Sequence, residues 1–247
     1  MSITYEDIAW ENAIDDLYNE AKMDRARKEQ CIFLFVEGES EEIAFPILLN
    51  ELIDMNELGV VVANYNGIGN LAAALRLLSK TLSHDRPIIV TYDNDIKGVT
   101  NTRKIKIPKA KSDLFHLFPI PQIEVVEYPN GHTGGSFEES FLEDDFIKCA
   151  FTENVISKEV LEKRKDFENI FRVNKPWLKQ LEKFCAELGF INCEIKKTAL
   201  AEELATSVKN IPGTYIKLAE LIKEVRTQYP VIHPDDVDLP KIPGLTA

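Results

Sequence analysis

Short apolar runs alternate with longer amphipathic segments along the first half of the chain. Residues 31–36 (CIFLFV) are a continuous apolar run, which is typical of a strand buried on both faces of a sheet. Similar runs predict three more strands, at residues 59–64, 87–92 and 123–128. Segments 41–52 and 71–82 carry apolar residues at helical spacing. Strands that alternate with helices predict a parallel α/β sheet with right-handed crossovers.

Beyond Ser136 the pattern of apolar residues is helical only. The expected helices are at residues 138–150, 157–170, 176–188, 197–210 and 214–227. Residues 1–30 also predict an amphipathic helix that docks or packs, with Ile8, Ile14 and Leu17 among many charged residues. We therefore expect an N-terminal helix at 1–30, an α/β domain at 31–150, and a helical C-terminal region with an extended tail at 151–247.

The chain is acidic, and this limits how it can bind a polyanion. Its 247 residues include 29 Lys and Arg but 41 Asp and Glu, a net charge of −12. A nucleic-acid binder that relied on overall charge would be basic, so a local basic patch or metal ions would be needed.

The apolar runs are too short to span a bilayer, the first residues do not resemble a secretory signal, and the four cysteines form no CxxC pair. The sequence predicts a soluble cytoplasmic protein with no membrane association.

Acidic residues follow two of the predicted strands at the point where each strand ends. Glu37 follows the first strand, and Asp93 and Asp95 follow the third; Glu41 lies one helical turn after Glu37. If the first and third strands are neighbours, these side chains converge at one sheet edge. Clustered carboxylates repel one another, and a divalent cation relieves the repulsion. Hard oxygen ligands favour magnesium or manganese over zinc. Any one of these residues alone is more simply a solvated loop residue, but four at such positions favour a functional site.

Two further segments could contribute to such a site. Residues 134–138 (GGSFE) form a flexible turn that presents the Ser136 hydroxyl and the Glu138 carboxylate, although on its own this segment is better explained as a helix cap. Residues 97–111 contain six basic and no acidic residues and could hold a phosphate backbone beside the site; a solvated charged loop is an equal alternative. The six are Lys97, Arg103, Lys104, Lys106, Lys109 and Lys111.

Taken in order, four motifs resemble a TOPRIM domain. They are FVEGESE at residues 35–41, NGIGN at 66–70, VTYDND at 90–95 and the GxSxE element at 134–138. Their order and spacing are most similar to those of the OLD (overcoming lysogenization defect) family of nucleases. The resemblance covers about residues 31–145. It implies a TOPRIM-like (Rossmann-like) parallel four-stranded sheet flanked by helices, here with a helical C-terminal region.

The resemblance also implies an endonuclease that hydrolyses phosphodiester bonds with two Mg²⁺ or Mn²⁺ ions per site. Glu37, Asp93 and Asp95 would hold metal ions, with Glu41 and Glu138 completing the second site. The Ser136 hydroxyl would orient metal-bound water or phosphate. The family also uses a lysine further along the chain, and the segment KKTALA at 196–201 supplies one. We assign this role to Lys197 and keep Lys196 as the alternative, since no motif fixes the register.

The sequence departs from the family at one point. OLD proteins usually carry an ATPase domain before the TOPRIM domain, but no GxxxxGK[ST] segment occurs in this chain. The resemblance therefore implies a nuclease that acts alone, as a homodimer, or with a separate ABC-type ATPase chain, as in split anti-phage defence systems. Its nucleic-acid substrate could be DNA or RNA.

Two other functions remain open at this point. A catalytically silent TOPRIM domain could bind nucleic acid or regulate a partner. Alternatively, Asp93-Asn94-Asp95 resembles the nucleophile motif of haloacid-dehalogenase-type phosphatases. That family places the motif on its opening strand, which would leave Glu37 and Glu41 without a role.

Overall fold

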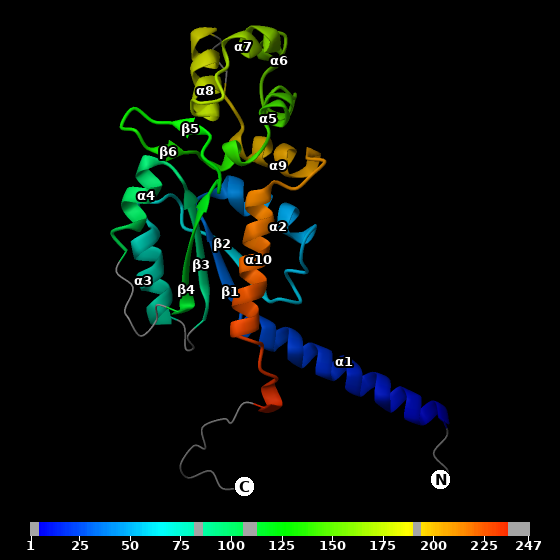
Figure 1. Cartoon of the computed structure of the whole chain (residues 1–247). Helices are drawn as coiled ribbons and strands as arrows, with labels where there is room; N and C mark the ends of the chain where they lie inside the picture. Colours follow the sequence, from blue (N-terminus) through cyan, green and yellow to red (C-terminus); the bar gives the residue numbers. More distant parts are fainter. Residues whose placement is uncertain (1–4, 82–85, 106–112, 190–193, 237–247) are drawn as a thin grey trace.

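A four-stranded parallel sheet forms the centre of the computed structural model, which describes residues 5–81, 86–105, 113–189 and 194–236 (Figure 1). Its strands are β1 (Ile32–Val36), β2 (Val60–Asn64), β3 (Ile88–Asp93) and β4 (Phe115–Ile120), in the order β2-β1-β3-β4. Every neighbouring pair is parallel. The predicted α/β fold, a four-stranded parallel sheet flanked by helices, is therefore confirmed.

The prediction of the fourth strand at 123–128 is wrong. The fourth strand of the sheet is β4, and within 123–128 only β5 (Val126–Glu127) is extended, in a separate antiparallel pair with β6 (Thr133–Gly134). The sequence of β4, FHLFPI, hides the strand because it contains a histidine and a proline. Proline is tolerated there because β4 lies at the edge of the sheet.

The two faces of the sheet pack against different helices because alternate residues of a strand point to opposite faces. Leu34 and Val36 belong to the larger core, which includes α2 (Glu39–Asn50) and α10 (Gly213–Gln228). Phe35 belongs to a smaller cluster on the other face. That cluster packs under α3 (Leu71–Thr81), and α4 (Ile96–Thr102) lies on the same side (Figure 1).

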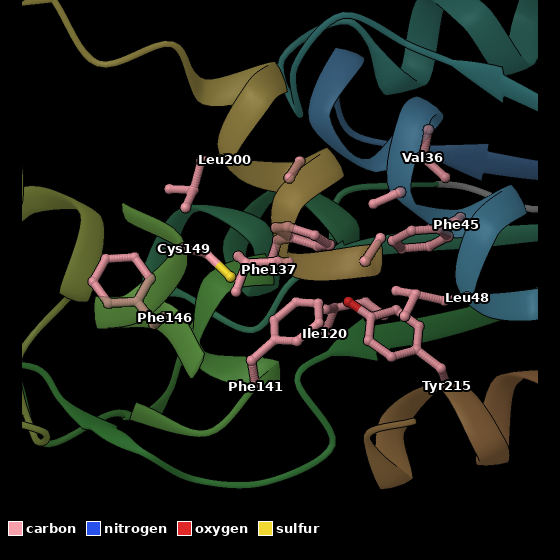
Figure 2. Packing of buried hydrophobic residues seen from close by; sticks show 14 of the residues in the cluster. Val36, Phe45, Leu48, Ile120, Phe137, Phe141, Phe146, Cys149, Leu200 and Tyr215 are labelled. Atoms are coloured by element: carbon pink, nitrogen blue, oxygen red, sulfur yellow. The ribbon is translucent and has the colours of Figure 1, made fainter. Parts of the chain in front are cut away.

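The larger core continues into the helical C-terminal part of the chain. Its elements are η2 (Phe137–Ser140), α5 (Glu143–Ala150), α6 (Lys158–Leu161), α7 (Arg164–Ile170), α8 (Trp177–Glu187), α9 (Lys197–Ser207) and α10. The helices predicted at 176–188, 197–210 and 214–227 are confirmed, whereas those predicted at 138–150 and 157–170 are each divided in two. Leu200 of α9 and Tyr215 of α10 lie in one cluster with Phe45 of α2 (Figure 2). The C-terminal helices and the sheet thus share one hydrophobic core.

The N-terminal helix α1 (Tyr5–Glu29) extends away from the rest of the molecule (Figure 1). Near its end, Ala26 is buried and Lys22 pairs with Asp235 of η3 (Pro234–Asp236). From Trp10 to residue 21, the described side chains are exposed. Among the described residues, no helix has the length and apolar character needed to cross a membrane.

Candidate active site

The ends of β1 and β3 lie side by side, as predicted, and bring their acidic residues together. Phe35 of β1 is in register with Val90 of β3. Just beyond these positions, the backbone N–H of Asp93 donates to Glu37 Oε2 at 3.4 Å, and the N–H of Ile68 donates to Glu37 Oε1 at 3.3 Å. Glu37 therefore links the end of β3 to the turn that follows β2.

The glycine turn at residues 66–70 wraps around the first strand end. Asn66 and Gly67 have positive φ angles of 53° and 89°, a left-handed conformation that glycine adopts most readily. This bend allows the Gly67 N–H to donate to the Glu37 carbonyl at 2.7 Å. The NGIGN motif thus fixes the backbone on which Glu37 sits.

An open pocket of about 220 Å³ lies at this edge of the sheet and contains most of the predicted site residues. It is lined by Ser40, Glu41, Asp93, Asp95, Tyr128, Ser136, Phe137, Glu138, Pro176, Leu178, Lys179, Glu182 and Lys197. Glu37 contacts the backbone of Asp93 and is not part of the lining. The pocket gathers side chains from the α/β part of the chain and from helices α8 and α9.

Three carboxylates of the pocket are oriented by backbone N–H groups. Asp93 Oδ1 accepts a hydrogen bond from the N–H of Phe137 at 3.2 Å. Asp95 Oδ1 caps α4 by accepting from the N–H of Gly98 at 2.6 Å, and Glu41 Oε2 accepts from the N–H of Gly38 at 3.1 Å at the start of α2. Because each carboxylate has a second oxygen outside these bonds, each retains an oxygen for a ligand.

The GxSxE segment serves both as a cap and as part of the site. The Ser136 hydroxyl lies 2.9 Å from Glu138 Oε2 and 2.6 Å from Glu139 Oε2. Glu139 also accepts from the Ser136 N–H at 2.6 Å, and its other oxygen accepts from the N–H of Trp177 at 2.6 Å. Glu138 lines the pocket, whereas Glu139, which the sequence analysis did not identify, connects this segment to the start of α8.

Gly134 allows the segment to approach the end of β3. A Cβ atom at position 134 would lie 1.8 Å from the carbonyl oxygen of Asn94, which is far inside van der Waals contact. The same carbonyl accepts a hydrogen bond from the N–H of Gly135 at 3.1 Å. Only glycine fits here without moving the backbone, so the close approach places Ser136 and Glu138 beside Asp93.

A buried aromatic cluster adjoins the carboxylates, and its member Phe137 lines the pocket with Asp93. Phe137 lies 5.2 Å from Phe141 between ring centroids, and Phe45 lies 5.4 Å from Tyr215 (Figure 2). All four rings are buried. Because carboxylates are costly to ionise next to such an apolar surface, we expect their protonated forms to be favoured.

The pKa values of the clustered carboxylates are raised accordingly. Burial is the largest cause, and it raises the pKa of Glu41 and that of Glu138 to about 7. Burial also raises the pKa of Asp93 well above its ordinary value, and the negative charges of Glu41, Glu37 and Glu138 raise it further. The pKa of Glu37 is raised by burial, against smaller lowering effects of the hydrogen bonds from the N–H groups of Asp93 and Ile68. The site therefore concentrates negative charge that its own surroundings do not neutralise.

Lys197 lines the pocket. It is the first residue of α9, and its Nζ atom lies 2.8 Å from Glu182 Oε1 of α8. Both lysines are exposed, but Lys196 is not part of the pocket lining. Of the two lysines that the sequence left open, the geometry favours Lys197.

The predicted basic segment is only partly described, and its first part is not the expected loop. Lys97 lies on helix α4, because Asp95 caps a helix where the sequence analysis expected irregular chain. Arg103 and Lys104 are exposed just after this helix. None of these three belongs to the pocket lining. The remaining basic residues, Lys106, Lys109 and Lys111, lie outside the described residues.

Three pocket residues had no recognisable signal in the sequence. Tyr128 lies just after β5, and Lys179 and Glu182 lie on α8. No motif surrounds them, and α8 could be predicted as a helix without indicating what it packs against. Lys179 adds a second positive charge to the wall that holds Lys197.

The donor set is suited to a hard divalent cation. Among the described residues, no three His, Cys, Asp or Glu side chains lie close enough together to hold a metal ion as they stand. One oxygen of Asp95 and one of Glu41 accept from the starts of their own helices. The ligands available are all carboxylate oxygens. Burial is the main cause of their raised pKa values, and neighbouring negative charges raise them further; a bound cation would favour the ionised carboxylates. The residues therefore fit Mg²⁺ or Mn²⁺ better than zinc.

Three of the four motifs lie in a segment that matches the model of a known family. Residues 32–95 match the family model "Overcoming lysogenization defect protein-like, TOPRIM domain". A structural match is the C-terminal region of the Burkholderia pseudomallei OLD protein, with 17% identity, a TM-score of 0.43, and coverage of 78% of this chain and 96% of that one. Another is the C-terminal region of the Xanthomonas campestris pv. campestris OLD protein, with 17% identity, a TM-score of 0.46, and coverage of 80% and 96%. No curated protein matches the chain significantly.

Proposed function

We propose that this chain, in which residues 32–95 form a TOPRIM domain resembling that of the OLD family, is a metal-dependent endonuclease that hydrolyses phosphodiester bonds in nucleic acid. One observation carries the proposal: a single pocket gathers carboxylates from the end of β3 and the start of α2, the GxSxE segment and a lysine from α9. The OLD-like domain supports a nuclease-type activity in general. The metal ions, the individual residue roles and the substrate are our inference.

The carboxylates would bind the metal ions. Glu37, Asp93 and Asp95 would hold divalent cations, and Glu41 and Glu138 would complete a second position, giving two Mg²⁺ or Mn²⁺ ions per site. When bound, such ions activate water and stabilise the leaving oxygen of the phosphodiester. They also neutralise the acidic pocket, so that a polyanion can approach a chain with a net charge of −12.

Two other side chains would act on the phosphate. The Ser136 hydroxyl, which lies within 2.9 Å of Glu138, would turn toward a phosphate oxygen or a nucleophilic water. Lys197 lines the same pocket and would stabilise negative charge that develops in the transition state. In this proposal residues 31–150 are the catalytic domain, and residues 151–247 contribute Lys197. Lys97, Arg103 and Lys104 would contact the nucleic acid outside the pocket.

The finer biological role depends on the resemblance alone. OLD-type nucleases usually work with an ATPase. We infer that the chain works in the cytoplasm with a separate ABC-type ATPase chain, as the nuclease of an anti-phage defence system.

The direct test is cleavage by the purified chain. Supercoiled plasmid DNA and total RNA are incubated with it in Mg²⁺, in Mn²⁺ and in EDTA, and the products are separated on gels. We expect cleavage of at least one substrate with either ion, none in EDTA, and recovery when Mg²⁺ is restored. Binding without cleavage in all three conditions would contradict the proposal and favour a nucleic-acid-binding or regulatory subunit.

We expect Lys197→Gln to lower the cleavage rate about 10- to 100-fold, because one positive charge that lines the pocket with the metal-binding carboxylates is lost. Glu182→Gln should maintain or raise the rate, since it releases Lys197 from the ion pair at 2.8 Å. Both partners of this pair are about half exposed, so the free energy of unfolding should change by less than about 1 kcal/mol in either variant. Single-turnover rates and thermal unfolding measure the two effects.

Lys196→Gln is the matched comparison, since it removes the same charge one position away. An equal loss of rate in Lys196→Gln and Lys197→Gln would show that the effect comes from general surface charge. A loss in Lys196→Gln alone would show that Lys196, and not Lys197, has the proposed role.

A further inference from the structure

Two side chains that line the pocket carry hydrogen-bond donors without a partner in the described part of the chain. They are the Lys179 ammonium and the Tyr128 hydroxyl. Lys197, the other lysine of the lining, is instead paired with Glu182 at 2.8 Å. Both free donors line a space of only about 220 Å³, so both are available to one bound ligand.

Tyr128 is held in place by contacts that lead to the end of β3. Its backbone N–H donates to the His132 carbonyl at 2.8 Å, and its ring stacks on the His132 ring with 5.6 Å between centroids. His132 Nε2 lies 3.0 Å from the carbonyl oxygen of Asn94, and because a carbonyl oxygen only accepts, Nε2 is the donor. Asn94 lies between Asp93 and Asp95 in the chain. The Tyr128 ring is therefore tied to the backbone that carries both carboxylates.

The start of α8, which carries Lys179, is fixed to the same part of the molecule. The Glu127 N–H donates to the Asn174 carbonyl at 3.1 Å, and the Asn174 side chain donates to Glu127 Oε2 at 3.3 Å. Two residues before Lys179, the Trp177 N–H donates to Glu139 Oε1 at 2.6 Å. Lys179 itself is exposed, so its charge extends from a well-anchored helix start.

The chemistry of these two donors suits a phosphate group. An ammonium group and a protonated phenol hydroxyl both donate hydrogen bonds, and bonds from a charged donor to phosphate are among the strongest in proteins. A nucleic-acid strand carries one negative charge at every nucleotide. When one phosphate lies at the metal-binding carboxylates, its neighbour therefore needs a partner of its own on a chain with a net charge of −12.

We propose that Tyr128 and Lys179 form a subsite for the phosphate next to the scissile one, which sets the position of the strand on the metal-binding carboxylates. The proposal rests on the nuclease function proposed above and adds a substrate contact to it. The neighbouring phosphate keeps its charge during hydrolysis, so the two side chains would bind the substrate and the transition state equally. Their loss should therefore raise KM and leave kcat unchanged.

The first test compares Lys179→Gln with Lys183→Gln on whichever nucleic acid the wild type cleaves. Lys183 lies one turn further along α8, is also exposed and is not part of the pocket lining. We expect Lys179→Gln to raise KM about tenfold, as for the loss of a hydrogen bond to a charged group, and Lys183→Gln to leave KM unchanged. An equal rise in both variants would show an effect of general surface charge and overturn the subsite. A fall in kcat at unchanged KM would place Lys179 at the scissile phosphate and would also overturn it.

The second test separates the Tyr128 hydroxyl from its ring. Tyr128→Phe keeps the ring that stacks on His132 and removes only the donor, so we expect KM to rise about fivefold. Tyr18→Phe, an exposed change on α1, is the matched control and should leave KM unchanged. If Tyr128→Phe binds substrate as well as the wild type and Tyr128→Leu does not, the ring stacks on a base and the phosphate contact of Tyr128 is wrong.

Binding measured without cleavage keeps this inference separate from the nuclease function. Fluorescence anisotropy of labelled single- and double-stranded oligonucleotides, in Ca²⁺ in place of Mg²⁺, gives the binding constant over a range of salt concentrations. Each phosphate contact contributes about 0.7–0.9 to the slope of log K against log salt. Lys179→Gln should lower the slope by about this amount, and Lys183→Gln should not change it.

The combined outcomes distinguish the two proposals. An unchanged salt slope in Lys179→Gln, with a wild type that cleaves, overturns the subsite and leaves the nuclease function in place. A lowered slope with a wild type that binds but never cleaves supports the phosphate contact and overturns the nuclease function. A wild-type chain that binds neither oligonucleotide overturns both.

Discussion

Asp93→Asn is expected to lower metal-dependent cleavage by about a thousandfold or more. Asp93 is the last residue of β3 and lines the pocket. The negative charges of Glu41, Glu37 and Glu138 all raise the pKa of its carboxylate. Asparagine keeps an oxygen for the Phe137 N–H, which Asp93 Oδ1 accepts at 3.2 Å. The substitution therefore maintains the local geometry and removes the negative charge that would bind a cation. Losses of about this size are typical when a central electrostatic element of an active site is removed.

The stability of the Asp93→Asn variant separates a lost ligand from a damaged fold. Without metal ions, Asp93 is a buried carboxylate with negative neighbours, so its removal should leave the melting temperature unchanged or raise it. Asp144→Asn, an exposed change at the start of α5, is the matched control and should keep full activity. If Asp93→Asn cleaves as fast as the wild type, the metal-binding role of this edge of the sheet is wrong.

The stability of the metal-free protein is expected to fall as the pH rises from about 4.5 to about 7. In the folded chain the pKa values of Glu41 and Glu138 are about 7, raised from an ordinary value of 4.5. Between these pH values the folded state binds more protons than the unfolded state, so the free energy of unfolding decreases with pH. The effect is about 3 kcal/mol for each group taken alone.

Magnesium should reverse this loss, and more strongly at pH 8 than at pH 5. Protons and cations compete for the same carboxylates, and an ion that binds only the folded state at 100 times its Kd adds about 2.7 kcal/mol. Urea unfolding at several pH values measures the pH dependence of the free energy of unfolding in EDTA and the stabilisation that Mg²⁺ adds. Glu138→Gln removes one of the titrating groups, so its metal-free stability should depend less on pH than that of the wild type. An unchanged pH slope in this variant would show that the slope comes from the general negative charge of the chain.

The main features of the sheet and of its acidic edge could be predicted because they follow from local sequence. Continuous apolar runs mark β1, β2 and β3, and the residues that follow parallel strands meet at one edge. The contact between Glu37 and the Asp93 backbone agrees with this reasoning. The fourth strand could not be predicted in the same way, since the apolar signal of β4 is interrupted by His116 and Pro119.

Other parts of the site depend on contacts between distant segments, which a single sequence does not reveal. Glu139 looks like an ordinary helix-start residue, but its second partner, the N–H of Trp177, is 38 residues away. Lys179 and Glu182 lie on a helix that was predicted, yet their place in the pocket depends on how α8 packs. The ion pair of Lys197 with Glu182 also depends on how α8 packs, because it joins α9 to α8.

The two oxygens of Glu139 hold two segments whose positions matter in different ways. One oxygen accepts from Ser136, and the other accepts from the first residue of α8, each at 2.6 Å. Because the side chain of Glu139 is almost fully buried, its two hydrogen bonds connect the GxSxE turn firmly to the start of α8. A molecule that pushes α8 from outside would therefore shift the serine hydroxyl without entering the pocket.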